Sequence, residues 1–262
     1  QSKFHKFVFI SNWQYQRYQL FHKIPYDEKS CVLESGIDPA PQNVFEQKDQ
    51  EKIRLVYTST PQRGLEILVP VFEQISKNYP EIHLDVFSSF KIYGWDEADK
   101  QFEPLYDRIR NNKNMTYHGF VPNKTLKDHL NKCHIFAYPC TWTETSCRAM
   151  LEAMSAGLVC VHPNNGALHE TSGSLNIMYQ GNTDFHKHAN IFASHLEAAI
   201  NFVKNNKHNE MIRFNKLFVD NRFNMTKIVH QWENMLRELL NKYPNGENRE
   251  LAKQQLFSYR TS

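Results

Sequence analysis

The sequence predicts an α/β fold, a Rossmann-like, doubly wound parallel sheet. Short apolar runs recur along the 262 residues, and patterns typical of amphipathic helices lie between them. Parallel strands need crossover connections, which are usually helices and almost always right-handed. The alternation therefore favours layered helices around one sheet.

The first half of the chain supplies two strand–helix units. Residues 53–59, IRLVYTS, form a β-branched and aromatic run, and an apolar helical stripe follows from Leu65 to Ile75. Residues 82–89 alternate apolar and polar side chains as a strand does. Residues 96–112 then predict a charged helix. Its inward side chains are expected to be Phe102, Leu105 and Ile109.

The same alternation continues into the second half. Residues 115–122 and 134–139 predict strands with a helix between them, and residues 158–162 predict another strand after a helix that begins near Glu144. From His186 onward the pattern is helical, and after Pro244 the tail is polar. The final helix is expected to present Ile228, Trp232, Met235 and Leu239 on one face.

Composition excludes several function classes. The chain has 31 basic and 28 acidic residues without a dense Lys/Arg block, so it implies neither nucleic acid nor anionic membrane as a partner. It has no apolar run of the ~20 residues that a transmembrane segment needs, and no signal peptide at its start. We therefore expect a cytoplasmic protein. It begins with Gln1 and not with Met, which favours a part of a longer chain.

Cysteine and histidine spacing predicts no metal site. The five cysteines are odd in number and form no C-x-x-C pair, which is typical of reduced packing thiols. His118, His162 and His169 fit no spacing that metal sites use.

Ligands of open α/β sheets collect where parallel strands end and helices begin. The first such turn, TSTPQRGLE, offers the hydroxyls of Thr58 and Ser59, the cation Arg63, and Gly64, whose missing Cβ would let a ligand approach the backbone. This turn is suited to a phosphate. The absence of G-x-G-x-x-G and of a P-loop leaves dinucleotide oxidation and P-loop hydrolysis without support.

A later turn, YPCTWTETSC, brings Glu144, Thr145 and Ser146 to the same edge at the expected start of a helix, and Glu152 follows eight positions after Glu144. Two such glutamates are most often a solvated helix face. Eight helical residues rise about 12 Å, so the two carboxylates would lie about that far apart along the helix.

The order of these segments resembles the C-terminal, donor-binding lobe of family 4 (group 1) retaining glycosyltransferases, which have the two-lobed GT-B fold. The corresponding stretches are QRGLEIL, YHGFVPN, PCTWTETSCRAMLEAMSAGLVCV and NNGALHE. The resemblance implies three parts. Residues 1–37 resemble the end of the N-lobe and the interdomain crossing, 38–221 the nucleotide-sugar-binding domain, and 222–262 the C-terminal crossover helix, here with Phe223 and Trp232, and a polar tail.

The resemblance also implies roles for the two glutamates. Glu144 would accept hydrogen bonds from the donor sugar and Glu152 from the ribose. The N–H groups near Ser146 and Cys147 would face the diphosphate. Arg63 takes the place of the family's phosphate-binding lysine, and a guanidinium can hold two phosphate oxygens. The alternative is an exposed arginine in a turn without a ligand.

Other positions match the family less fully. Thr58 stands where many members carry a second arginine, and Lys91 or Lys124 are only weak substitutes. Phe120 and Val121 correspond to the loop lining the base pocket, although packing alone would explain them equally well. Glu170 corresponds to the end of a Gly-rich turn or to a helix-start carboxylate. Asp96 and Asp99 form no D-x-D, so the resemblance implies transfer without a bound metal.

The leading hypothesis is therefore the donor-binding domain of a retaining, metal-independent glycosyltransferase. Its donor would be a nucleotide diphosphate sugar, most often a UDP- or GDP-sugar, with no further cofactor. The acceptor, a glycan, lipid or protein, would bind through an N-terminal lobe missing from the sequence, so the fragment alone is expected to be inactive. The alternative is a non-catalytic nucleotide-sugar-binding or scaffold module of a larger polypeptide. A nucleotide-sugar epimerase fits the paired glutamates poorly.

Overall fold

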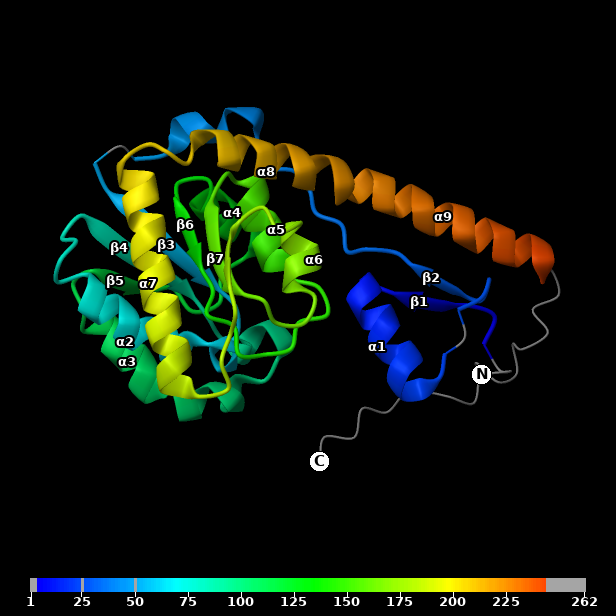
Figure 1. The fold of residues 1–262 in the computed structure, drawn as a ribbon, viewed down its shortest axis with the longest axis horizontal. Helices are drawn as coiled ribbons and strands as arrows, with labels where there is room; N and C mark the ends of the chain where they lie inside the picture. The colour runs from blue at the N-terminus through cyan, green and yellow to red at the C-terminus, as the bar shows by residue number, and fades with distance from the viewer. Residues whose placement is uncertain (1–3, 25, 50, 244–262) are drawn as a thin grey trace.

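The computed structural model describes residues 4–24, 26–49 and 51–243. Its main feature is a six-stranded sheet in the order β5-β4-β3-β6-β7-β8, with all neighbouring strands parallel. This arrangement confirms the doubly wound α/β fold (Figure 1). The strands are β3 (Ile53–Thr58), β4 (Ile82–Phe87), β5 (Met115–Tyr117), β6 (Ile135–Ala137), β7 (Val159–Pro163) and β8 (Ile177–Tyr179).

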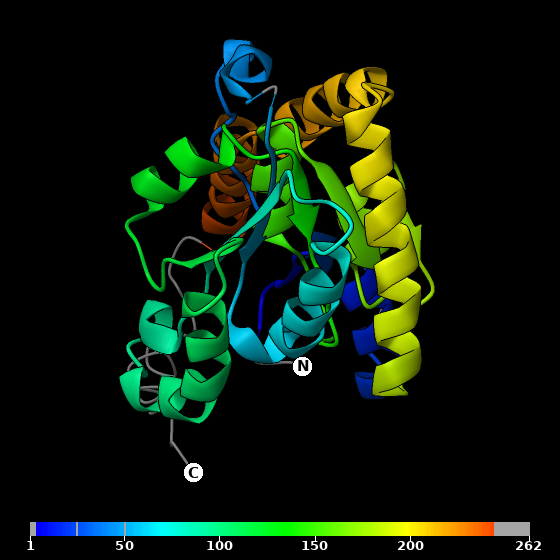
Figure 2. The same ribbon diagram turned by 90° about the vertical axis from the view of Figure 1, so that its left-hand side faces the viewer.

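Helices cover both faces of this sheet (Figure 2). One group, α2, α3 and α7, packs together on one face, and α4, α5 and α6 pack on the other. Their bounds are α2 (Leu65–Ile75), α3 (Glu103–Arg110), α4 (Asn123–Leu130), α5 (Arg148–Ser155), α6 (Leu168–Ser172) and α7 (Phe185–Lys204). Short 3-10 helices are η1 (Gln42–Gln47), η2 (Pro61–Arg63), η3 (Phe90–Tyr93) and η4 (Asp96–Phe102).

A smaller unit precedes the large sheet. It consists of β1 (Phe7–Phe9), α1 (Asn12–His22) and β2 (Ser30–Val32), and the two strands pair in parallel. Two long helices follow the sheet, α8 (Asn209–Arg222) and α9 (Met225–Lys242), and α9 extends from the sheet domain to the small unit (Figure 1).

The chain crosses between the two units at two adjacent points. Ile37 donates its N–H to the Phe223 carbonyl at 2.8 Å, and Met225 donates its N–H to the Ile37 carbonyl at 2.9 Å. Arg222 adds a two-pronged ion pair with Glu34, at 3.1 and 2.6 Å. The outgoing and returning segments are therefore joined side by side.

Two buried lysines fix the segment that leads into the sheet. Lys48 donates to the carbonyls of Cys133 and Ala156, and burial lowers its pKa to about 8. Lys216 donates to the Ala40 carbonyl at 2.7 Å and pairs with Asp220 at 2.8 Å. Backbone carbonyls and a carboxylate thus satisfy the ammonium groups that burial removes from water. Within the described ranges, no helix is long and apolar enough to span a membrane.

The structure departs from the predicted elements in several places. The helix expected over residues 96–112 is divided into η4 and α3, because Pro104 lacks the N–H that a continuous helix would use. Ile109 is buried there as expected, whereas Phe102 and Leu105 are half-buried. On α9, Ile228 is buried but Trp232 is exposed. The sequence patterns did not predict β8 or α6, and the polar tail after Pro244 lies outside the described residues.

Gly64 closes the turn after β3 against the end of β6. Its φ is +112°, and a Cβ at this position would lie 2.2 Å from the Pro139 carbonyl oxygen. The expectation that a missing Cβ leaves room for a ligand was wrong, because protein backbone fills that space. Gly64 instead lets the turns after β3 and β6 meet.

We predict that Gly64→Ala destabilises the protein more than Gly94→Ala does. Both glycines have positive φ, so each substitution carries left-handed backbone strain of about 1–2 kcal/mol. Of the two, only Gly64 adds a steric clash, since no atom of a described residue lies within 4 Å of a Cβ at Gly94. Overpacking adds about 1–3 kcal/mol, which lowers the melting temperature further by at least about 2 °C. Equal melting temperatures of the two variants would contradict this account.

A second prediction concerns acid stability. His162 on β7 is fully buried, and burial lowers its pKa to about 4. Between pH 6.5 and 4 the His162 imidazole is protonated in the unfolded chain and neutral in the folded state. The free energy of unfolding therefore decreases as the pH falls through this window. At pH 5 the penalty is about 2 kcal/mol. In urea titrations, the free energy of unfolding of the unmodified protein should decrease from pH 7 to pH 5. In His162→Leu this decrease should be smaller by about 2 kcal/mol.

His230→Leu, on the exposed surface of α9, is the matched control for this experiment. Its loss of stability between pH 7 and pH 5 should still include the contribution of His162. If His162→Leu also keeps that dependence, His162 is protonated in the folded state and the assignment fails.

Candidate functional site

The strand order reverses between β3 and β6. The chain proceeds from β3 outward to β4 and β5, then returns to place β6 on the other side of β3. Ligands of open α/β sheets bind outside the carboxyl ends of strands at such a switch point. Arg63 lies in the turn after β3, and Glu144 lies in the loop after β6. Both predicted catalytic residues are therefore at the switch point.

The two side chains form an ion pair there. Arg63 Nη1 lies 2.7 Å from Glu144 Oε1, and the Tyr138 hydroxyl donates to the same oxygen at 2.7 Å. The Arg63 guanidinium also lies over the Trp142 ring, 5.9 Å from its centroid. Glu144 is buried, so the carboxylate depends on these donors. Burial lowers the pKa of Arg63, but the Glu144 charge and the Tyr138 hydroxyl together more than offset it, and the pKa rises above its usual value.

Several polar side-chain atoms at the end of β3 and in the turn after it are unsatisfied. Thr58 Oγ1, Thr60 Oγ1, Gln62 Oε1 and Arg63 Nε are buried and make no hydrogen bond to any described residue. Ser88 Oγ, just beyond β4, is also buried and makes no hydrogen bond to a described residue. Buried polar atoms without partners are uncommon, because each costs about 1–3 kcal/mol. A polar ligand at this edge would supply the missing partners.

The loop after β6 is longer than the sequence predicted. Helix α5 begins at Arg148, and Cys147 precedes it with non-helical φ and ψ and no side-chain cap. Glu144, Thr145 and Ser146 therefore lie in the loop, and the 12 Å helical spacing between the glutamates does not apply. Thr145 and Ser146 are half-buried, and Cys147 is buried. The first N–H groups of α5 have no intrahelical acceptor and are available to an anion.

Glu152 lies one helical turn into α5 and contributes to a second region. It lines a cavity of about 440 Å³ with residues of α4 and of the segment that starts at Asp38. Burial raises the pKa of Glu152, and Arg148 lies 3.8 Å from its carboxylate. Phe120 is 53% exposed and Val121 is half-buried. Neither is among the described residues that line this cavity.

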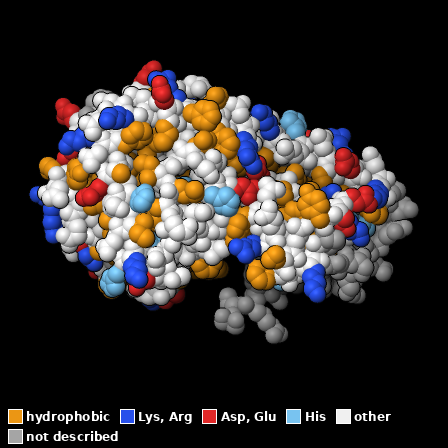
Figure 3. Space-filling model, in the orientation of Figure 1, with side chains coloured by type: hydrophobic (Ala, Val, Ile, Leu, Met, Phe, Trp, Pro, Cys, Tyr) orange, Lys and Arg blue, Asp and Glu red, His pale blue; other side chains and the backbone are white. Residues whose placement is uncertain are grey.

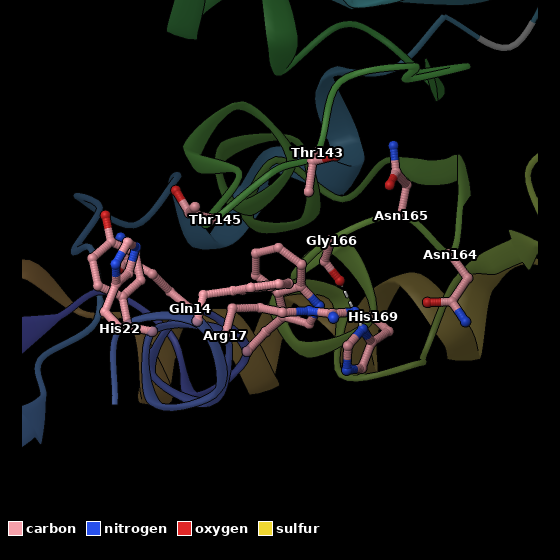
Figure 4. Close-up of a pocket in the computed structure, with 12 residues that line it drawn as sticks. Gln14, Arg17, His22, Thr143, Thr145, Asn164, Asn165, Gly166 and His169 are labelled. Atoms are coloured by element: carbon pink, nitrogen blue, oxygen red, sulfur yellow. Dashed lines mark hydrogen bonds between the residues drawn. The ribbon is translucent and has the colours of Figure 1, made fainter. Parts of the chain in front are cut away.

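A larger cavity of about 890 Å³ separates α1 from the loops after β6 and β7. Figure 4 shows side chains of α1 on one side and loop residues on the other. Its lining residues are Trp13, Gln14, Arg17, Tyr18, Phe21, His22, Thr143, Thr145, Asn164, Asn165, Gly166 and His169. The cavity lies between the small unit and the carboxyl edge of the sheet.

Glu170 holds the small unit in this position. Its carboxylate accepts hydrogen bonds from the Asn12 N–H at 2.8 Å, the Asn12 amide at 2.7 Å and the Trp13 N–H at 2.9 Å. A carboxylate at a helix N-terminus satisfies free N–H groups and favours the helix dipole. Glu170 therefore caps α1, and not the start of its own helix α6. Trp13 and Glu170 are 157 positions apart in the sequence.

Several residues differ from their expected surroundings. His118 lies at the β5 edge of the sheet, whereas His162 and His169 belong to β7 and α6, so the three do not form one cluster. Ser59 is 3.5 Å from the Tyr138 hydroxyl. Sequence reasoning missed Tyr138 and Trp142, although both belong to the same stretch as Glu144.

Positive and negative side chains are interspersed over the face seen in Figure 3.

Similar solved structures have the same fold. A glycosyltransferase from Rickettsia africae ESF-5 aligns with a TM-score of 0.70 and 14% identity over 91% of this chain and 64% of its own. The pneumococcal O-GlcNAc transferase GtfA, solved with UDP and GlcNAc, aligns with a TM-score of 0.68 and 14% identity. The alignment covers 90% of this chain and 45% of GtfA. Anabaena Alr3699/HepE, solved with UDP and glucose, aligns with a TM-score of 0.62 and 16% identity. The alignment covers 89% of this chain and 63% of Alr3699/HepE. This is the Rossmann-like fold of GT-B glycosyltransferases.

Sequence comparison agrees with the fold. One subunit of the phosphatidylinositol N-acetylglucosaminyltransferase of Arabidopsis thaliana is 26% identical over 158 residues, which are 55% of this chain and 34% of the plant protein. The chain thus spans about a third of this relative and less than two thirds of the three structures. A family model described as glycosyl transferases group 1 matches residues 37–217. The chain therefore belongs to the group 1 glycosyltransferase family.

Proposed function

We propose that this chain is the donor-binding part of a retaining, metal-independent glycosyltransferase of family 4, and that it binds a nucleotide diphosphate sugar. The observation that carries the proposal is the Arg63–Glu144 pair at the switch point, where buried polar atoms have no partner among the described residues. A diphosphate and a sugar together supply an anion for the arginine and hydroxyl donors for the glutamate.

The proposed ligand position follows the carboxyl edge. Arg63 and the N–H groups near Ser146 and Cys147 bind the diphosphate, and Gly64 positions the arginine. Glu144 accepts from sugar hydroxyls, and Glu152 accepts from the ribose beside the 440 Å³ cavity. Thr58, Ser59 and Thr145 supply hydroxyls at the same edge. Phe120 and Val121, before α4, are proposed to contact the base.

The ion pair indicates how the donor would be activated. When the diphosphate takes the Arg63 guanidinium, Glu144 loses its charged partner and becomes free to accept from the sugar. As the bond to the sugar breaks, charge grows on the leaving diphosphate, where Arg63 and the α5 N-terminus stabilise it. This arrangement supplies positive charge without a metal ion, which supports metal-independent transfer.

The proposal extends to the nucleotide and to the acceptor. Two structural relatives were solved with UDP, so a UDP-sugar is the first candidate and a GDP-sugar the second. The acceptor, a glycan, lipid or protein, is proposed to bind against an N-terminal lobe, with residues 1–37 as its end, 38–221 as the donor domain and 222–262 as the crossover and tail. The five free thiols favour a cytoplasmic location.

A second candidate is a non-catalytic nucleotide-sugar-binding or scaffold module. Thr58, which is not a cation, favours it, since Arg63 would then hold the diphosphate with one side chain only. Both candidates predict that the 262 residues alone bind the nucleotide without transferring sugar to an added acceptor. Robust transfer by this chain would contradict both, and slow hydrolysis of the donor would not.

Binding by variants tests the roles of the ion pair. Arg63→Gln should weaken UDP and a UDP-sugar alike, because a lost charged hydrogen bond costs about 1.5–3 kcal/mol, or roughly 10- to 100-fold in Kd. Glu144→Gln should weaken only the UDP-sugar. It releases Arg63, so UDP should bind equally well or more tightly. Glu152→Gln should weaken both ligands through the ribose. Calorimetric titration with UDP, UDP-glucose and UDP-N-acetylglucosamine measures these differences.

Arg237→Ala on the exposed surface of α9 is the charge-matched control and should leave every Kd unchanged. Circular dichroism must show that each variant is folded, because removing one partner of a buried pair destabilises a protein. GDP and ADP extend the panel to other bases. The proposal fails if no nucleotide binds. The role of Glu144 fails if Glu144→Gln weakens UDP as strongly as the UDP-sugar.

A further inference from the structure

A buried carboxylate outside the proposed donor site is surrounded by metal-ligating side chains. Asp85 lies in β4, and its side chain is only 3% exposed. Its Oδ1 is 2.8 Å from His118 Nε2. Its Oδ2 is 3.2 Å from His129 Nε2 and 3.4 Å from Arg54 Nη1. The two oxygens therefore face different partners.

Cys133 completes a group of three donor types. It follows His129 by four residues, and its thiol donates to the His129 carbonyl at 3.4 Å. Ligand atoms of Asp85, His129 and Cys133 all lie within 4.8 Å of one another. Zinc bonds of about 2.0–2.3 Å in a tetrahedron place their donors roughly 3.3–3.8 Å apart. Side-chain movements of about 1 Å would therefore bring the three atoms to bonding positions.

The ring nitrogen of His129 faces the Asp85 carboxylate without forming a well-directed hydrogen bond. His129 Nε2 is buried and lies 3.2 Å from Asp85 Oδ2, but within the described ranges it makes no hydrogen bond of acceptable geometry. His118 is better placed as an orienting residue, since it bonds the other carboxylate oxygen. Phe87 stacks on the His118 ring at 4.2 Å, with 5° between the planes, and fixes its orientation. Such outer contacts typically hold metal ligands in position.

We propose that Asp85, His129 and Cys133 bind a zinc ion, with His118 orienting the carboxylate and solvent in the fourth position. Oxygen, nitrogen and sulfur donors together suit zinc, whereas calcium and magnesium prefer oxygen alone. The side chains of His118 and His129 are 24% and 27% exposed, which gives the ion a path from solvent. Arg54, 31% exposed, would turn outward when the ion replaces its charge.

The chemistry of the thiol is compatible with this assignment. A thiol buried in apolar surroundings keeps its proton when no metal ion binds it. A coordinated zinc ion displaces that proton, and binding then releases it to solvent. The ion would join β4 to the end of α4, beside the loop that continues from His118 to Phe120. The metal-free transfer proposed above concerns the separate edge at β3 and β6.

Cobalt substitution and zinc titration of the 262-residue chain test the site. One equivalent of Co²⁺ should give visible absorption typical of tetrahedral coordination and a near-ultraviolet thiolate charge-transfer band, and Zn²⁺ should displace it. Cys133→Ser should remove the charge-transfer band. His129→Gln and Cys133→Ser should each weaken zinc at least about 100-fold, since even outer contacts contribute 10- to 100-fold. Competition with a chromophoric chelator measures these affinities.

Matched controls separate this site from adventitious binding by the protein's 13 histidines. Cys160→Ser removes another buried thiol, and His230→Gln removes an exposed imidazole. Both should keep the charge-transfer band and the zinc affinity. His129 is partly exposed, so its variant should fold even if Cys133→Ser does not. Failure to bind one equivalent of zinc, or unchanged affinity in His129→Gln, would overturn the proposal.

Discussion

The ion pair between Arg63 and Glu144 is the contact on which the arrangement of the carboxyl edge depends. Glu144 is buried, and a buried carboxylate is stable only when donors surround it. Arg63 and Tyr138 supply those donors from the turn after β3 and the end of β6. Because the two loops flank the reversal of strand order, the pair holds the switch point together. It also keeps both charged groups ready for a ligand that could replace either one.

Glycines and backbone contacts bring the loops to this position. Gly64 lets the turn after β3 lie against Pro139, and Gly166 does the same for the loop after β7 against the Glu144 backbone. A Cβ at Gly166 would lie 2.2 Å from the Glu144 carbonyl oxygen. The Ala167 N–H then donates to that carbonyl at 2.7 Å. Three connections on the sheet edge thus converge on one buried glutamate, whose side chain and backbone are both fixed.

Local patterns were enough to predict β3 to β7 and most helices of the sheet domain, because periodicity records which face of each element is buried. They were also enough to select Arg63 and Glu144. They could not predict that these two residues contact each other, since 81 positions separate them and only the sheet order brings them together. The start of α5 was misplaced because Cys147 carries no capping signal. The group around Asp85 was missed for a similar reason, since its members come from β4, the loop after β5, α4 and the turn after α4.

The paired crossing at Ile37 has a mechanical consequence. Two chain segments pass side by side between the small unit and the sheet domain, joined by hydrogen bonds to both sides of Ile37. Two parallel connections resist twisting and separation, but they still permit bending about the line that joins them. Glu170 of α6 binds the N-terminus of α1 directly and is a separate contact between the two units. Bending at Ile37 would therefore move the small unit relative to the sheet domain, and the hydrogen bonds of Glu170 restrain that motion.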